Sequence, residues 1–191
     1  NAAREGVVIN SAAMRLFYFP KPAKNQKNQQ RVVITYPIGV GKVGWETPIG
    51  TTKIVSKRKN PVWSPPPSVR KEHAEKGDPL PAQVPAGPDN PLGAYAMNLG
   101  WPSYLMHGTN KPPGVGMRAS HGCIRLSRPM DLADRLVGEV AGWPREKIDA
   151  AFASGKTTRV TLPDLIPVHL IYATAFEGDG DGDGHSERTE Q

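Results

Sequence analysis

The stretch "RVVITYPIGV", residues 31–40, has the composition of a β-strand, because β-branched and aromatic side chains dominate it. Similar runs recur between turn signals along the chain. They are "GVVIN" (6–10), "MRLFYF" (14–19), "TTKIVS" (51–56), "AYAMNL" (94–99), "YLMHG" (104–108), "TRVTL" (158–162) and "VHLIYATAF" (168–176). Strands at this fairly regular spacing predict a mainly β protein, a sandwich or a barrel, rather than a parallel sheet wrapped by helices.

Two helices are expected between residues 127 and 155. Ser127 is positioned to cap the first, whose apolar stripe consists of Leu132, Ala133, Leu136, Val137 and Val140. The second has Pro144 near its first turn and Gly155 as a stop signal. Its apolar face consists of Ile148, Ala151 and Phe152.

Residues 60–91 differ in kind from the strand-like runs around them. They hold nine of the twenty prolines and show little periodicity, which predicts a long, stiff excursion. Loops longer than about 12–15 residues are commonly functional covers or linkers. Strand-like sequence resumes directly after the excursion, so we interpret it as a flap over one end of the β structure, with plain surface decoration as the alternative.

The net charge of +6 is unevenly distributed. Residues 177–191 hold six acids and one arginine, which leaves 23 basic and 12 acidic residues in the rest. Such a basic body attracts polyanions without selecting among them. Because the sequence has neither a basic ribbon interleaved with aromatics nor a helix-turn-helix pattern, nucleic acid is not an expected partner.

Targeting signals are also lacking in the sequence. No apolar run approaches the roughly 18 residues of a membrane helix, so no transmembrane segment is expected. The first residues do not combine a basic region with an apolar one, so we expect a signal peptide to be absent or already removed.

Residues 177–191 formally fit the calcium loop of an EF-hand. The acidic ligands of such a loop would be Asp179, Asp181, Asp183 and Glu190. No flanking helices are expected, and Ser186 occupies the usual central apolar position. We therefore interpret this stretch as an acidic, Gly/Asp-rich hairpin or tail.

The only cysteine, Cys123, lies in "ASHGCIRLS" (119–127), two positions after His121 and next to Gly122. It could be a nucleophile, a metal ligand or an inert buried sulfur. A nucleophilic cysteine needs a base, most often a histidine. His121 is too close along the backbone to face Cys123 in an extended segment, whereas His107 ends a strand-like run sixteen residues upstream.

The Pro- and Gly-rich stretch 111–120 predicts a hairpin-like return that brings His107 beside Cys123. Gly122 permits a tight turn that leaves amide N–H groups free to stabilise a tetrahedral oxyanion. This spacing is consistent with a thiol acyl-transfer site. A zinc site formed by His107, His121 and Cys123 is an alternative, although no fourth ligand supports it.

The stretch "HGTNKPPGVGMRASHGCIRL" (107–126) resembles the signature of the L,D-transpeptidase catalytic domain, a family of cysteine-dependent enzymes that remodel bacterial peptidoglycan. The resemblance includes a Thr-Pro-x-Gly turn at 47–50, and "VPAGPDNPLGAYAMNLG" (84–100) is similar to the periplasmic Gram-negative branch. It implies a catalytic domain over residues 1–176, built as a β-sandwich of mixed sheets with one or two short helices and the 60–91 flap over the active site.

The resemblance also implies roles by position. Cys123 would be the nucleophile and His107 the general base, with the carbonyl of Gly108 orienting the imidazole. His121 and Gly122 would shape the site and its oxyanion hole. No cofactor and no metal ion are implied.

Two arginines are candidates for binding substrate. Arg125 follows the cysteine motif and would either bind a substrate carboxylate or form a structural salt bridge beneath the loop. Arg118 is a second candidate for carboxylate binding.

The reaction implied by the resemblance begins with attack of the thiolate on the amide before the terminal D-alanine of a peptidoglycan tetrapeptide stem. D-alanine leaves, a thioester forms, and an amine of another stem or of an envelope protein accepts the acyl group. The expected partners are peptidoglycan stem peptides, and the expected location is the periplasm or cell envelope. Alternatives are an L,D-carboxypeptidase or amide hydrolase of the same fold, and a non-catalytic wall-binding protein.

Overall fold

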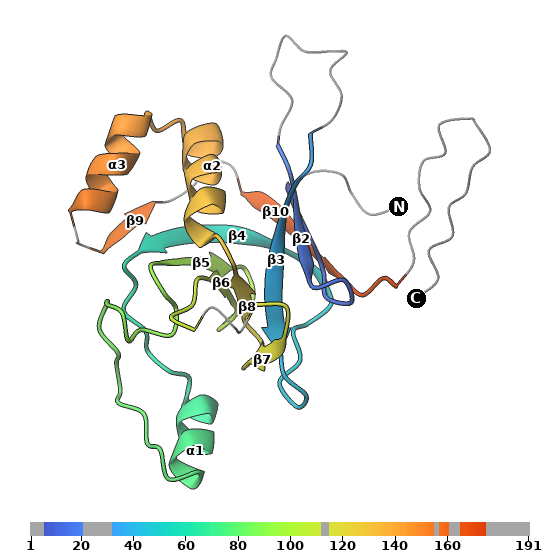
Figure 1. Cartoon of the computed structure of the whole chain (residues 1–191), viewed down its shortest axis with the longest axis vertical. Coiled ribbons are helices and arrows are strands. Elements are labelled where there is room, and N and C mark those ends of the chain that lie inside the picture. The colour runs from blue at the N-terminus through green and yellow to red at the C-terminus, as the bar shows by residue number, and fades with distance from the viewer. Residues whose placement is uncertain (1–5, 21–31, 112–114, 155–156, 161–164, 175–191) are drawn as a thin grey trace.

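The computed structural model of the chain describes residues 6–20, 32–111, 115–154, 157–160 and 165–174 (Figure 1). Its strands, in chain order, are β1 (Gly6–Asn10), β2 (Arg15–Phe19), β3 (Ile34–Gly41), β4 (Gly50–Lys59), β5 (Tyr95–Leu99), β6 (Leu105–His107), β7 (Arg118–Ser120), β8 (Ile124–Leu126), β9 (Thr158–Val160) and β10 (Ile166–Ile171). Its helices are α1 (Pro67–Glu75), α2 (Pro129–Ala141) and α3 (Arg145–Ala153).

The strands form one mixed sheet that closes on itself. Hydrogen bonding passes from β10 through β1, β2, β3, β8, β6 and β5 to β4, and β4 pairs with β10 as well. The pairs β1–β10, β3–β7 and β6–β8 are parallel, and the other described pairs are antiparallel. The predicted mainly β fold with mixed pairing is confirmed, and its layers are joined into a closed sheet (Figure 1).

Every run that the sequence predicts as a strand contains one, although the bounds shift. β4 continues to Lys59, past the predicted end of its run, while β10 ends at Ile171. Residues 31, 161–162 and 175–176 of the predicted runs lie outside the described residues, as does the whole predicted acidic hairpin or tail. The three-residue strands β7 and β8 are not predicted, because they lie in a stretch that reads as a turn.

The described residues contain three helices, where the sequence predicts one or two. α2 forms in the predicted region, but Ser127 does not cap it: the N-cap residue is Arg128 and makes no side-chain cap bond. The helix begins at Pro129, whose fixed φ and missing N–H suit a first helical position. α3 begins after Pro144, as predicted, and Gly155 lies outside the described residues.

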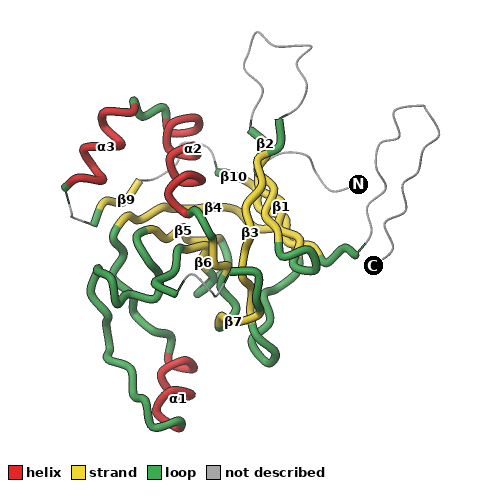
Figure 2. The backbone as a smooth tube through the Cα atoms, viewed as in Figure 1, coloured by secondary structure: helices red, strands yellow, loops and turns green. Residues whose placement is uncertain are grey.

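The third helix, α1, is the unpredicted one and forms inside the Pro-rich excursion. It also begins at a proline, Pro67, but Val69 is its one residue noted as buried. Without an apolar stripe it carries no periodic signal of a helix. The rest of the excursion is loop (Figure 2).

The base of the excursion is pinned by one buried amide. Asn90 is fully buried, and its Nδ2 donates to the carbonyls of Pro61, Val84 and Pro85. These bonds tie the two arms of the excursion together beside the barrel. Figure 1 shows α1 projecting beyond one end of the strands, far from α2 and α3.

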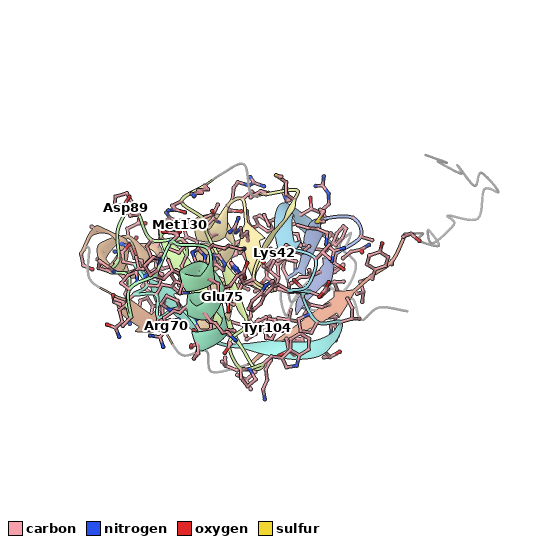
Figure 3. All side chains as sticks on the ribbon, turned by 90° about the horizontal axis from the view of Figure 1, so that it is seen from below. Lys42, Arg70, Glu75, Asp89, Tyr104 and Met130 are labelled. Atoms are coloured by element: carbon pink, nitrogen blue, oxygen red, sulfur yellow. The ribbon has the colours of Figure 1, made fainter. Side chains whose placement is uncertain are left out.

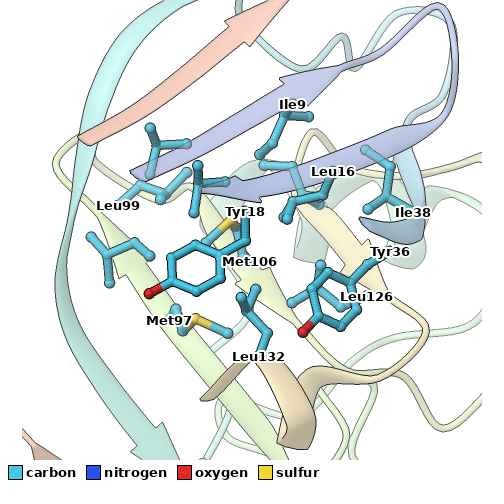
Figure 4. Close-up of a cluster of buried hydrophobic side chains, with 14 of the residues drawn as sticks. Ile9, Leu16, Tyr18, Tyr36, Ile38, Met97, Leu99, Met106, Leu126 and Leu132 are labelled. Carbon is cyan, nitrogen blue, oxygen red and sulfur yellow. The ribbon is translucent and has the colours of Figure 1, made fainter. Parts of the chain in front are cut away.

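The hydrophobic core fills the space enclosed by the closed sheet and is covered by α2 on one side (Figure 4). Each large aliphatic side chain buried there stabilises the fold by about 1.5–3 kcal/mol. Tyr36 adds a polar tie, because its hydroxyl donates to the Asp131 carboxylate of α2 over 2.6 Å. Figure 4 labels the central members Ile9, Leu16, Tyr18, Tyr36, Ile38, Met97, Leu99, Met106, Leu126 and Leu132. Within the described ranges, no helix has both the length and the apolar character needed to cross a membrane.

Candidate functional site

The strands β6 and β8 bring the two halves of the candidate site together. They pair in parallel, with Met106 opposite Ile124 and His107 opposite Arg125. The connection between them is therefore a crossover that passes through β7, and the predicted hairpin-like return is wrong. A hairpin would join antiparallel strands, whereas parallel neighbours need a connection of about a dozen residues or more, which 108–123 supplies.

The register places the reactive side chains on one face of this strand pair. Successive side chains of a strand point to opposite faces. Met106 and Ile124 are fully buried in the core, so His107 and Arg125 face away from it. Cys123 precedes Ile124, and its thiol lies close enough to Arg125 to respond to the guanidinium charge. His107 responds to the same charge, so Arg125 lies near both candidate catalytic groups.

His107 is held as a neutral imidazole with a defined tautomer. Its side chain is buried, and Nδ1 lies 2.5 Å from the carbonyl oxygen of Gly108. A carbonyl only accepts hydrogen bonds, so the proton sits on Nδ1 and Nε2 keeps its lone pair. Burial lowers the pKa of His107 to about 4, and the Arg125 charge lowers it further while the Gly108 carbonyl opposes the shift. The ring is therefore ready to accept a proton at neutral pH.

Gly108 has no room for a side chain. A Cβ at this position would lie 3.0 Å from Pro129 Cγ and 3.3 Å from the Leu92 carbonyl oxygen. The Gly108 amide donates to the Tyr95 carbonyl over 2.9 Å. Close packing and this bond fix the carbonyl that faces His107.

Cys123 is half-buried and carries a thiol rather than a thiolate at rest. Its Sγ lies 3.7 Å from the carbonyl oxygen of Ser103, which can only accept a hydrogen bond. Burial raises the pKa of Cys123, while the Leu105 backbone and the Arg125 charge lower it in part. Ser103 has a left-handed φ of 68°, which is uncommon for a residue other than glycine. The turn before β6 thus holds a strained residue directly at the sulfur.

Gly122 adopts a conformation that only glycine takes readily. Its φ is +96°, and a Cβ would lie 2.9 Å from Tyr104 Cε1. The Gly122 carbonyl accepts from Thr47 Oγ1 over 2.9 Å, and the Thr47 oxygen accepts from the Gly41 amide over 2.9 Å. The Thr-Pro-x-Gly turn that begins at Thr47 therefore braces the loop of the nucleophile. Ser120 adds a second brace, because its Oγ donates to the Cys123 carbonyl over 2.5 Å.

His121 is engaged with α1 and its neighbourhood. Nε2 lies 3.0 Å from Glu72 Oε2 and 3.2 Å from Lys42 Nζ. The ring also meets the Trp45 indole edge-on, with 4.9 Å between the ring centroids. Burial, and next the Lys42 charge, lower the pKa of His121.

Arg125 and Arg118 have different surroundings. The Nε of Arg125 is buried and has no hydrogen-bond partner among the described residues, and no ion pair joins it to a described acid. The salt bridge considered from the sequence is therefore not formed within this part of the chain. Arg118 is exposed, and its Nε donates to the Gly41 carbonyl over 3.2 Å.

Several residues of the site are not found by sequence reasoning. Glu72 and Lys42 lie 49 and 79 residues before His121, and nothing in their local sequence marks them as its partners. Ser103 likewise shows its left-handed φ only in the fold. Across the described residues, no three His, Cys, Asp or Glu side chains are grouped so that they could hold a metal ion, so the zinc alternative finds no assembled ligand set there.

A cavity of about 240 Å³ lies at the carboxyl ends of β6 and β8. Because Cys123 precedes β8, the length of that strand, roughly 10 Å, separates the sulfur from this cavity. The cavity is lined by Ala94, Gly108, Thr109, Val115, Leu126, Ser127 and Pro129.

Comparison with known proteins gives a consistent result. The sequence model of the YkuD family, described as the L,D-transpeptidase catalytic domain, matches residues 4–161. The probable L,D-transpeptidase YbiS of Escherichia coli K12 is 49% identical over 127 residues, which are 66% of this chain and 39% of that protein. The probable L,D-transpeptidase ErfK/SrfK of Salmonella typhimurium is 46% identical over 127 residues, 66% of this chain and 38% of that protein. The chain thus spans less than half the length of these relatives.

Solved structures were also compared with the fold. L,D-transpeptidase 3 from Mycobacterium tuberculosis gives a TM-score of 0.45 at 20% identity, covering 86% of this chain and 60% of that one. The catalytic domain of the E. faecium L,D-transpeptidase gives 0.44 at 17% identity, covering 90% of this chain and 100% of that one.

Proposed function

Because this chain belongs to the L,D-transpeptidase catalytic domain family, we propose that it is an L,D-transpeptidase acting on the tetrapeptide stems of peptidoglycan. The observation that carries the proposal is the pairing of β6 with β8, which puts a neutral His107 and the thiol of Cys123 on one face of adjacent parallel strands. A neutral base beside a thiol is the arrangement that nucleophilic acyl transfer requires.

The first chemical step is acylation. His107 Nε2 takes the thiol proton as Cys123 Sγ attacks the carbonyl carbon of the amide that precedes the terminal D-alanine. The tetrahedral oxyanion is stabilised by backbone N–H groups around Gly122 and Cys123, a contribution of about 3 kcal/mol per donor. His107 then returns the proton to the departing amine, D-alanine leaves, and a thioester remains on Cys123.

The second step transfers the acyl group to an amine. The acceptor loses a proton to His107 Nε2 and attacks the thioester, which releases the Cys123 thiol. The amine belongs to another stem, which gives a cross-link, or to an envelope protein, which gives an anchor. Water competes with this amine, so a cover over the site favours transfer. The 60–91 segment is positioned for this role, because α1 contacts His121.

Substrate recognition involves Arg125 and Arg118 in this proposal. The Arg125 guanidinium lies near Cys123, and its buried Nε lacks a partner among the described residues, so a stem carboxylate would satisfy it. Arg118 is exposed beyond Gly41 and would provide a weaker, peripheral attraction. The basic body of the chain suits an acidic wall polymer, and the proposed location is the periplasm or cell envelope.

The alternative is a hydrolase of the same fold, an L,D-carboxypeptidase or amide hydrolase, in which water replaces the amine. Incubation with disaccharide-tetrapeptide separates the two. Cross-linked dimer together with free D-alanine supports transfer, whereas shortened monomer alone supports hydrolysis.

Exposure to a carbapenem tests the nucleophile itself. The intact chain should gain the mass of one ring-opened carbapenem, and Cys123→Ala should gain none. If the unsubstituted protein stays unmodified at a pH where the thiol is free, the catalytic proposal fails and the non-catalytic wall-binding alternative gains support.

A further inference from the structure

Helix α1 meets the barrel through one carboxylate. Apart from Val69, no residue of α1 is noted as buried, so the helix has little apolar surface with which to dock. Glu72, in contrast, is only 18% exposed at its side chain and reaches two barrel residues, Lys42 and His121. Figure 3 shows α1 from below, with Arg70 and Glu75 labelled on it and Lys42 labelled beyond β3.

The two oxygens of Glu72 have separate partners. Oε1 accepts from Lys42 Nζ over 2.6 Å and also from Lys76 Nζ, one turn further along the chain. Oε2 lies 3.0 Å from His121 Nε2. Because an ionised carboxylate only accepts, Nε2 carries a proton and donates to Glu72. The charge of Glu72 is therefore used on both sides.

The same contacts lead to the backbone of the nucleophile loop. The amide of Lys42 donates to the Ser120 carbonyl over 2.9 Å, and His121 precedes Gly122 directly. Trp45 packs edge-on against the His121 ring on the side of the β3–β4 loop. A displacement of His121 would turn the adjacent Gly122 amide, which has little freedom because Tyr104 lies against it.

We propose that Glu72 is a positioning residue that docks α1 and the 60–91 segment on His121 and Lys42, and so fixes the cover and the nucleophile loop relative to each other. The docking follows from the contacts alone. Its consequence for catalysis, that the docked cover keeps water from the thioester and so favours the amine as acceptor, rests on the proposed function.

The test compares Glu72→Gln with Glu75→Gln in the full chain. Glutamine keeps the shape of the side chain but removes the charge, and Glu75 is an exposed control on the same helix that pairs only weakly with Lys71, at 3.9 Å. Amide hydrogen exchange over α1 should become roughly 10-fold faster in Glu72→Gln, because hydrogen bonds to a charged group are lost. Exchange in Glu75→Gln should match the unsubstituted protein.

Two further measurements report on the site. Alkylation of Cys123 by iodoacetamide, which needs no substrate, should become roughly threefold faster or more in Glu72→Gln as the cover opens. With disaccharide-tetrapeptide, the ratio of hydrolysed monomer to cross-linked dimer should rise by a similar factor, since water reaches the thioester more often. A purely structural defect would lower both products together and leave their ratio unchanged.

Equal α1 exchange in the two variants would overturn the proposal. If Glu72→Gln does not fold, Lys42→Met removes one partner of the carboxylate and should show the same changes in smaller measure; unchanged exchange there would be equally decisive. A protein that forms no acyl-enzyme would contradict the proposed function, whereas α1 exchange would still decide whether Glu72 docks the helix.

Discussion

The hydroxyl of Thr47 donates to the carbonyl of Gly122 over 2.9 Å, and this bond joins the turn after β3 to the loop that presents the nucleophile. The two residues are 75 positions apart in the chain. The same hydroxyl oxygen accepts from the Gly41 amide, so Thr47 is satisfied on both sides. Its role is to hold the Gly122–Cys123 peptide in the orientation that an oxyanion hole needs.

Thr47→Val should therefore impair catalysis more than folding. Valine keeps the shape but leaves the Gly122 carbonyl and the Gly41 amide without their partner, which costs about 1–3 kcal/mol. We expect kcat for D-alanine release to fall roughly 10-fold with KM little changed, because the oxyanion is stabilised only in the transition state. Thr47→Ser keeps the hydroxyl and should retain most activity. Equal loss in both variants would contradict this role.

Gly122→Ala should abolish acylation through a steric clash as well as backbone strain. The new Cβ would lie 2.9 Å from the Tyr104 ring at a φ of +96°. Gly77 is a matched control, since its φ is +77° and a Cβ there meets nothing within 4 Å. Gly77→Ala should cost only the strain of a left-handed alanine, about 1 kcal/mol, and leave carbapenem acylation unchanged. Stopped-flow fluorescence during carbapenem addition would measure both variants.

The protonation states at rest predict a distinct pH profile for Cys123. Because burial raises the thiol pKa and lowers that of His107 to about 4, the two groups form a neutral pair rather than a thiolate–imidazolium pair. The rate of iodoacetamide alkylation should therefore rise steadily with pH through the ordinary thiol range. A plateau of high reactivity below pH 6 would show an ion pair and contradict this assignment.

His107 should also make stability depend on pH. Its pKa is about 4 in the fold and near 6.5 when unfolded, so the unfolded chain binds more protons between these values. The contribution of His107 is present above about pH 6.5 and is lost as the pH falls toward 4. Urea denaturation at pH 4.5 and 7 should show this loss in the unsubstituted protein and a smaller one in His107→Gln. That variant should also lose roughly 100-fold or more in acylation rate, because a general base is removed.

Local composition predicts most of the fold, because the strands β1 to β6 are rich in β-branched and aromatic residues. It does not predict β7 and β8, whose three residues each form strands only because β3 and β6 offer partners far away in the chain. Helix α1 escapes for a related reason: it is polar, and its docking through Glu72 is a contact between residues 49 positions apart. Cys123 and His107 are identifiable because their chemistry and spacing are local, whereas Glu72, Ser103 and Lys42 become site residues only through tertiary contact.

Lys57 lies in β4 outside the proposed site and offers a test of the core. It is fully buried, opposite Met97 of β5, and its Nζ has no hydrogen-bond partner among the described residues. Burial lowers its pKa to about 7, whereas an unfolded lysine titrates near 10.4. The unfolded chain therefore binds more protons between these values, and the penalty that Lys57 imposes on folding is largest at neutral pH and below. Lys57→Met keeps the stem without the amine and should raise the free energy of unfolding by about 1–3 kcal/mol at pH 7. The gain should shrink toward pH 10, where the unfolded lysine also begins to lose its proton. Lys53→Met, at an exposed position of the same strand, is the control and should change little at either pH. If Lys57→Met were as stable as the unsubstituted protein at pH 7, or less stable, the amine would have a partner that stabilises its charge in the fold.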